Sequence, residues 1–268
     1  DILANADPLD LNRDGISGRA HMVPVLADPN APFRVGRFGW KAQLSNMLDF
    51  TADASLMEMG ITNRIVTEEN APNGDYDLLA LVDLVPDPED HPGAAFNYDG
   101  DVYLGEFIDR VADFQRFLAP PPQTPKSGMT GEVIFNTIGC AKCHIPQFMT
   151  ADDPNLEDAL RNKPVRAYSD FLLHEMGLAS FVDLGGGAFE FSGGLGDGIV
   201  QGDAGRTELR TPPLWGLALR SPMLHDGRVT GGTFEDQAAA SIAFHDSPGS
   251  EGSASAQAFA AQIGRAHV

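Results

Sequence analysis

Apolar residues recur at helical spacing in two long stretches of the first half of the chain. The segment GRFGWKAQLSNMLDFTADASLMEMG, residues 36–60, has most of its apolar positions three or four residues apart, which predicts one amphipathic helix or two in succession. The segment VYLGEFIDRVADFQRFL, residues 102–118, predicts another helix, ended by Pro120 to Pro122. The apolar positions expected on one face of that helix are Leu104, Phe107, Ile108, Val111, Phe114 and Leu118.

Proline and glycine divide the second half. APPPQTPKSG, residues 119–128, is the best candidate for a linker, and Thr130 is a suitable cap for a short helix through GEVIFNTIG. The glycine-rich stretch at 183–198 predicts a loop, and helices are predicted at 233–246 and 253–262. Alternating β-branched runs are scarce, so the pattern predicts a mainly α protein with long loops.

Composition narrows the possible partners. The chain has 38 acidic against 18 basic residues and a formal charge of −20. Phosphate backbones and anionic lipid require a basic surface, so the charge argues against nucleic acid and membrane surfaces and favours a basic protein partner. Apolar runs are far shorter than the ~20 residues of a membrane span, so none is expected.

Both cysteines stand in NTIGCAKCHIP, residues 136–146. The pattern C-x-x-C-H is the spacing of c-type haem attachment. Two thiols three positions apart reach the two vinyl groups of one porphyrin, and the adjacent imidazole becomes the proximal iron ligand. Cys140, Cys143 and His144 occupy these positions, which predicts one covalent haem c in this chain.

The cysteine pair has three other possible interpretations. A structural zinc site needs two more ligands at matched spacing, and the sequence has no second cysteine pair. A thioredoxin-like redox pair is expected beside a βαβ pattern, which the sequence does not show. A plain disulfide stays open. Haem is favoured because a helix, C-x-x-C-H and a loop-rich continuation are the layout of a cytochrome c fold. We therefore expect a cytochrome c-like haem domain over 126–262, preceded by a helical segment over 1–119.

Six sequence words resemble those of a known family. They are DLNRDGISGRA, VGRFGWKAQ, GEVIFNTIGCAKCH, YSDFLLHEMG, ELRTPPLWGLA and LHDGR, and they extend from Asp7 to about Phe259. In this order they resemble the di-haem oxidoreductases, assigned peroxidase or thiol oxidoreductase activity and related to bacterial di-haem cytochrome c peroxidases. Members carry a first C-x-x-C-H upstream of DGISGR. The resemblance therefore implies that this chain is a fragment with the second haem, and residues 1–119 are then the inter-haem segment.

The resemblance also implies a function. One haem of such proteins receives electrons, while the other meets peroxide or another oxidant. We therefore expect the electron-transfer part of a peroxidase-type oxidoreductase, with a redox partner protein and a small-molecule oxidant. The alternative is a non-catalytic electron carrier with a single haem. Attachment of c-type haem further implies a periplasmic or extracellular protein.

The axial ligand opposite His144 has several candidates. In the related enzymes it lies on the helix after HDG, and fourteen residues beyond His225 stands Ala239, which cannot ligate. Gly231, Gly232 and one further helical turn carry the position to His245, which is the favoured ligand. The alternatives are Met176 and Met223. His174 and His225 are expected to line the pocket and to form hydrogen bonds.

Two further residues have a possible role at the haem. Trp40 has the position of an electron relay between haems in the related peroxidases, or it is a buried aromatic on a helix face. Arg210 is suited to a haem propionate, with Pro212 and Pro213 of the RTPPLW word shaping the pocket wall. The alternative is an exposed loop arginine.

A calcium-loop pattern occurs near the start. Asp10, Asn12, Asp14 and the Ile16 carbonyl stand at positions one, three, five and seven, with Gly15 at six. The twelfth position holds His21 in place of a bidentate glutamate. Calcium is therefore a lesser possibility, and a turn stabilised by its own side chains is favoured.

The two ends have their own interpretation. The chain begins without methionine or a basic-then-apolar leader, so a signal peptide is expected to be removed or to lie outside it. The last six residues, IGRAHV, are what one reading frame of a common sequencing adapter encodes. We therefore expect 263–268 to be a non-native tail, the alternative being a genuine polar end.

Overall fold

The computed structural model describes residues 1–90, 105–122, 131–185 and 188–266. Helices take up 31% of the described residues and strands 11%. The strands are two to six residues long and pair into two-stranded antiparallel sheets. The prediction of a mainly α, cytochrome c-like fold is therefore wrong. Strands this short leave no readable alternation in the sequence, and irregular backbone replaces helix in several apolar stretches.

The chain folds as two compact units. The first unit comprises residues 1–21, 39–43 and 120–268, and the second comprises 22–38 and 44–119. The proline-rich stretch stands where the chain passes into the first unit for the last time. No helix among the described residues is long and apolar enough to cross a membrane.

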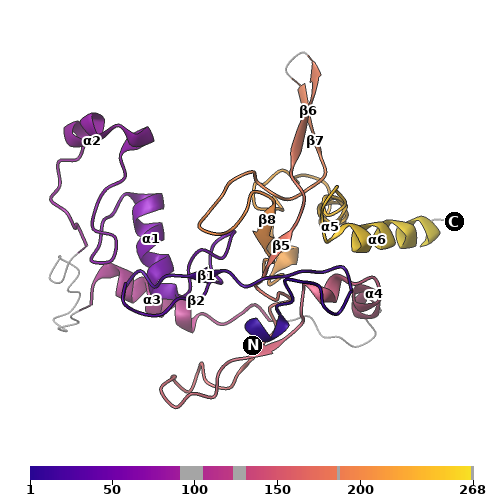
Figure 1. Cartoon of the computed structure of the whole chain (residues 1–268), viewed down its shortest axis with the longest axis horizontal. Helices are drawn as coiled ribbons and strands as arrows, with labels where there is room; N and C mark the ends of the chain where they lie inside the picture. The colour runs from indigo at the N-terminus through magenta and orange to yellow at the C-terminus, as the bar shows by residue number, and fades with distance from the viewer. Residues whose placement is uncertain (91–104, 123–130, 186–187, 267–268) are drawn as a thin grey trace. The chain divides into compact units, whose positions relative to one another are not determined.

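The second unit is built on two helices that pack against each other, α1 (Met47–Met59) and α3 (Phe107–Phe117) (Figure 1). Their buried residues include Ala52 and Leu56 on α1 and Ile108 and Ala112 on α3. The unit also contains the paired strands β1 (Met22–Val23) and β2 (Arg34–Val35), the 3-10 turn η2 (Pro72–Gly74) and the short helix α2 (Tyr76–Val82).

Helix α1 covers only the second half of the predicted helix at 36–60. Asn46 caps its start by accepting a hydrogen bond from the Asp49 backbone N–H at 2.9 Å, and Gly60 ends it with a φ of 66°. Residues 36–46 are not helical. Gly39 and Ala42 have φ values of 79° and 53° there, which a right-handed helix excludes.

Helix α3 confirms the predicted helix, but not its predicted apolar face. Ile108 and Ala112 are buried, whereas Phe114 and Leu118 are 66% and 57% exposed. Leu104 lies outside the described residues. The helix starts at a capping box formed by Glu106 and Asp109, which Arg64 also binds at 2.7 Å from each.

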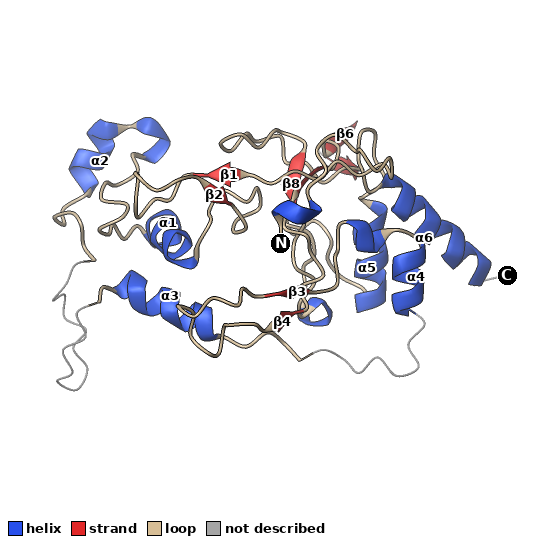
Figure 2. Cartoon of the chain, turned by 60° about the horizontal axis from the view of Figure 1, so that its bottom comes forward, coloured by secondary structure: helices blue, strands red, loops and turns tan. Residues whose placement is uncertain are grey.

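The first unit carries the remaining elements (Figure 2). Its helices are α4 (Gly131–Thr137), α5 (Phe234–Ala243) and α6 (Ser253–Ala266), and its 3-10 turns are η1 (Leu3–Asn5), η3 (Cys140–Lys142) and η4 (Leu217–Leu219). Two of its sheets pair β3 (Phe148–Met149) with β4 (Pro164–Val165) and β5 (Leu173–Glu175) with β8 (Glu208–Arg210). The predicted helices that follow the cysteine motif and the HDG word are thus confirmed as α5 and α6. The predicted cap Thr130 lies outside the described residues.

A hairpin replaces part of the loop predicted at 183–198. Strand β6 (Ser180–Gly185) pairs antiparallel with β7 (Ala188–Ser192) and projects from its unit in Figure 1. The loop prediction is wrong here because AFEFS, residues 188–192, stands between two groups of glycines and pairs with residues 180–185. A glycine run that connects two strands looks, in sequence, like a glycine-rich loop.

Two small apolar clusters are buried among the described residues of the first unit. Ala42, Leu173 and Ala204 form one, and Met176, Leu195 and Leu209 form another, against which Leu224 and Phe244 pack. Much of the unit is held together by buried polar contacts. The fully buried Lys41 donates through Nζ to the carbonyls of Gly205 and Glu208 at 2.8 and 2.6 Å, and lies 2.9 Å from Asp197 Oδ1.

The second unit offers a test of one such polar contact. The buried Asp49 carboxylate accepts hydrogen bonds from the backbone N–H groups of Leu26 and Ala27 at 2.8 and 3.1 Å. Asp49→Ala leaves both donors unpaired and should lower the free energy of unfolding by about 2 kcal/mol in urea titrations. Asp53→Ala, one turn further on α1, is the control. Burial and then Glu58 raise the pKa of Asp53, so removing it should change stability by less than about 0.5 kcal/mol. Equal losses in the two variants would contradict this role for Asp49.

Candidate haem site

The two cysteines and His144 lie on one tight turn after α4. Gly139 breaks the helix with a φ of 93°, and η3 begins at Cys140. The backbone N–H of His144 donates to the Cys140 carbonyl at 2.9 Å, so the turn places residues 140 and 144 one above the other. Both thiols are free and no disulfide joins them.

His144 is held as a neutral imidazole with a defined tautomer. Its Nδ1 lies 2.9 Å from the Tyr168 carbonyl oxygen. Burial lowers the pKa of His144 to about 4, so the ring is neutral near pH 7. A carbonyl only accepts, so Nδ1 carries the hydrogen and Nε2 keeps the lone pair that a metal requires.

The backbone of Tyr168 is unusual in a way that serves this contact. Its φ is 52°, in the left-handed region that a tyrosine seldom adopts. The Phe135 ring of α4 lies 6.3 Å from the His144 ring and 5.9 Å from the Tyr168 ring, centroid to centroid. The carbonyl and the aromatic ring together restrict the orientation of the imidazole.

His245 has the same chemistry as His144. It follows α5, and its Nδ1 lies 2.9 Å from the Ser241 carbonyl. Burial lowers the pKa of His245, which keeps the ring neutral with its lone pair on Nε2. A charge on His245 would also lower the pKa of His144. The two rings therefore share the same tautomer and the same neutral charge.

The predicted methionines are both buried. Met176 belongs to an apolar cluster with Leu195 and Leu209. Met223 is 4% exposed, and its Sδ accepts a hydrogen bond from Ser241 Oγ at 3.5 Å.

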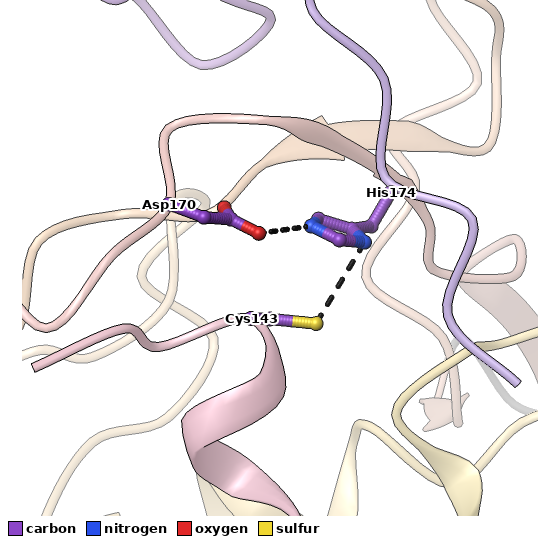
Figure 3. A group of neighbouring side chains, drawn as sticks. All are labelled: Cys143, Asp170 and His174. Atoms are coloured by element: carbon purple, nitrogen blue, oxygen red, sulfur yellow. Dashed lines mark hydrogen bonds and ion pairs between the residues drawn. The ribbon is translucent and has the colours of Figure 1, made fainter. Parts of the chain in front are cut away.

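Cys143 contacts a buried charged group centred on His174 (Figure 3). Cys143 Sγ lies 3.7 Å from His174 Nδ1, and Asp170 Oδ2 lies 2.8 Å from His174 Nε2. Glu251 Oε2 also reaches Nδ1, at 2.7 Å. Burial opposes a charge on His174, but the Asp170 carboxylate and its other partners outweigh it and raise the pKa well above the ordinary value. His174 is therefore an imidazolium that donates from both nitrogens. Burial also raises the pKa of the Cys143 thiol.

Cys143, Asp170 and His174 have the residue types of a metal site, with ligand atoms within 4.8 Å of one another. Figure 3 shows, however, that the cysteine and the aspartate face opposite nitrogens of the ring. A metal ion bound to one nitrogen of His174 could therefore reach the cysteine or the aspartate, but not both. The three side chains form a hydrogen-bonded chain instead.

Trp40 and Arg210 lie together in the first unit. Trp40 is 46% exposed, not buried on a helix face, and its ring lies 5.5 Å from that of His225. The Arg210 backbone N–H donates to the Trp40 carbonyl at 2.9 Å, and its Nε donates to the Gly39 carbonyl at 2.8 Å. Burial and then Arg220 lower the pKa of Arg210 to about 10. An adjacent anion would relieve this cost. The neighbouring Pro212 and Pro213 are half-buried.

The calcium-like loop is closed by its own backbone. Asp10 Oδ1 and Asn12 Oδ1 each accept from the Asp14 N–H at 2.9 Å, and Asp14 Oδ1 accepts from the Ile16 N–H at 3.0 Å. The His21 ring contacts the Lys41 carbonyl at 2.7 Å and not the loop. A cation is already present here, because Lys142 Nζ lies 2.7 Å from the Asp14 carbonyl oxygen.

The residues around the turn fit a haem. They supply paired thiols, a neutral imidazole whose Nε2 has a free lone pair, and an apolar surface on α4. None of the residues of α4 is buried, and Val133 and Ile134 are 67% and 40% exposed. An apolar helix exposed beside two thiols and an imidazole is the surface that a large flat apolar cofactor would cover.

A comparison with protein families decides the relationship. The family model described as "Di-haem oxidoreductase, putative peroxidase" matches residues 1–267. The chain belongs to the di-haem oxidoreductase family. This confirms the resemblance found in the sequence. No curated protein and no solved structure shows a significant match to the chain.

Several residues of this di-haem oxidoreductase site were not predicted. Tyr168 acts through its carbonyl, which no side-chain pattern reveals. Asp170 stands four residues before His174, a spacing that could have indicated a pair, whereas Glu251 is far away in sequence. Lys41 stands in the family word VGRFGWKAQ, and its complete burial gives no sequence signal.

Lys41 allows a test of the polar framework around Trp40. Lys41→Met keeps the methylene chain but removes the buried ammonium group that Asp197 and two carbonyls share. The free energy of unfolding should fall by about 3 kcal/mol, since breaking a buried pair strands the remaining charge. Lys163→Met, at an exposed position, is the control and should change stability by less than about 0.5 kcal/mol in the same calorimetric measurement. A loss below about 1 kcal/mol for Lys41→Met would show that its contacts are dispensable.

Proposed function

We propose that this chain binds one haem covalently through Cys140 and Cys143, with His144 as proximal iron ligand, and that it serves as an electron-transfer part of a peroxidase-type oxidoreductase. The observation that carries the proposal is the state of His144, a neutral imidazole with a free Nε2 lone pair beside two free thiols. Membership of the di-haem family supports the same function.

Bound haem supplies one-electron redox chemistry, and the residues of this chain determine its setting. The Tyr168 carbonyl orients the His144 ring and increases the electron density at Nε2 through the Nδ1–H hydrogen bond. Arg210, a half-buried cation with a lowered pKa, is suited to a propionate carboxylate. Trp40, whose ring is tilted against that of His225 and is partly exposed, is suited to pass electrons at the surface.

His245 is the favoured second axial ligand. Both of its competitors are engaged elsewhere, Met176 in an apolar cluster and Met223 through its sulfur with Ser241. His245 presents the neutral tautomer that iron requires, and its ring influences that of His144. Two histidine ligands give a lower potential than histidine with methionine, which is suited to electron delivery.

Partners and location follow from charge and chemistry. The net charge of −20 favours a basic redox protein as electron donor, and the family points to peroxide or a similar small oxidant. Covalent haem attachment places the protein in the periplasm or outside the cell. The chain carries one C-x-x-C-H, so a single-haem electron carrier is the alternative function. The oxidoreductase and the electron carrier differ in one respect: joined to a segment with a second haem, only the oxidoreductase should consume peroxide.

Covalent attachment is tested by extraction. Protein matured in an oxidising compartment should keep its haem colour through acid-acetone treatment, because thioether bonds survive it. Cys140→Ala with Cys143→Ala should lose all of the colour to the solvent. The absorbance of the protein pellet measures the result. Colour that leaves the parent protein would refute the proposed attachment.

The second ligand is tested by spectroscopy. With His144 and His245 on the iron, the ferric protein should be low-spin and lack the far-red band of sulfur ligation. His245→Ala should become high-spin and should bind cyanide. Met223→Leu, which keeps the buried volume, is the control and should leave the spectrum unchanged. A sulfur band in the parent, or a low-spin spectrum in His245→Ala, would assign the iron to another residue.

A further inference from the structure

The His174 ring is held on several sides by different residues. It is 2% exposed and lies between Asp170 at Nε2 and Glu251 at Nδ1, with Cys143 Sγ also near Nδ1. Gly18 packs on its remaining edge. A Cβ at residue 18 would lie 2.5 Å from His174 Cε1 and 3.0 Å from Nε2, closer than real contacts allow.

The partners of His174 are themselves anchored. Glu251 accepts a hydrogen bond from Ser17 Oγ at 2.5 Å. The Asp170 backbone N–H donates to the Cys143 carbonyl at 2.9 Å, and that of Ser169 donates to the Ile145 carbonyl at 3.0 Å. The imidazolium is therefore held in a fixed position relative to the backbone of the cysteine motif, and of the two cysteines its contact is with Cys143.

We propose that His174 is a positioning residue that orients the Cys143 sulfur for its thioether bond, an inference that rests on the proposed haem attachment. In that bond-forming step the Cys143 S–H adds across a vinyl double bond. The S–H bond breaks, an S–C bond forms, and the proton ends on the terminal vinyl carbon, with no oxidant or reductant consumed. The Nδ1–H serves Glu251 at 2.7 Å, and the Cys143 sulfur lies against the same edge of the ring at 3.7 Å. Contact with a ring held in this way restricts the sulfur to one side-chain rotamer, which favours attack from a single direction.

Selectivity between the two cysteines separates positioning from a general structural role. A residue needed only for folding would reduce attachment at both cysteines alike. His174 contacts Cys143, so its loss should affect the Cys143 bond while the Cys140 bond persists. The readout is the number and position of thioether bonds, which does not depend on catalytic turnover.

Two variants disturb the contact in different ways. His174→Gln keeps a polar side chain that cannot donate simultaneously to partners on opposite sides. Gly18→Ala keeps His174 but displaces its ring, and residue 18 has no positive φ that alanine would strain. Gly131→Ala is the matched control, because a Cβ at that position meets nothing within 4 Å. Cys143→Ala supplies the reference spectrum of a single thioether.

The full chain is matured with haem, and thioether bonds are located by peptide mass spectrometry and by the α-band of the reduced pyridine haemochrome. In His174→Gln and Gly18→Ala the band should move toward that of Cys143→Ala, with Cys140 still linked. The parent and Gly131→Ala should carry both bonds. Both bonds intact in the two variants, equal loss at both cysteines, or failure of both variants to accumulate would overturn the positioning role. Absence of covalent haem from the parent would instead refute the proposed function.

Discussion

The hydrogen bond between His144 and the Tyr168 carbonyl joins the cysteine turn to a segment on which the first unit depends. Residues 167–176 form hydrogen bonds with the cysteine turn, with Arg19 and with β8. The segment donates from Ser169 and Asp170 to carbonyls of the turn, and Leu173 pairs with Arg210 in β8 and exchanges backbone hydrogen bonds with Arg19. One short irregular stretch therefore sets the position of the imidazole, the arginine and the cysteine together.

Such a stretch requires backbone conformations that regular elements do not provide. Tyr168 and Phe171 both have positive φ, at 52° and 62°. Conformations of this kind persist only when the surroundings hold them, and here the holding groups are buried polar ones. Ser169 Oγ donates to the Thr211 carbonyl at 2.7 Å, and the Asp170 carboxylate accepts from both His174 and the Leu172 N–H. Polar contacts therefore do, beside the turn, what a large apolar core does in other folds.

This reliance on irregular polar structure explains how far the sequence could predict the molecule. Local patterns worked where the physics is local: α3 has its capping box, α5 its Thr233 cap, and C-x-x-C-H brings its residues onto one turn by spacing alone. The helix predicted at 36–46 does not form, because tertiary contacts outweigh the local helical pattern there. Lys41 is fully buried and binds acceptors more than 150 residues away in the sequence. The partners of His144 and His174 include a carbonyl and Glu251, whose approach depends on chain folding rather than on local spacing.

His144 and His174, which both lie at the cysteine turn, show how the surroundings give one residue type two different roles. His144 has an uncharged carbonyl as its hydrogen-bond partner, so burial prevails and lowers its pKa to about 4. His174 is 2% exposed, and burial opposes its charge, but two carboxylates outweigh the burial and raise its pKa. A protonated imidazole cannot bind iron, and a neutral one cannot donate from both nitrogens. Carboxylates surround one ring and not the other, so His144 can bind a metal while His174 is limited to hydrogen bonding. The sequence alone does not distinguish these two histidines, because the carboxylates reach His174 only through the fold.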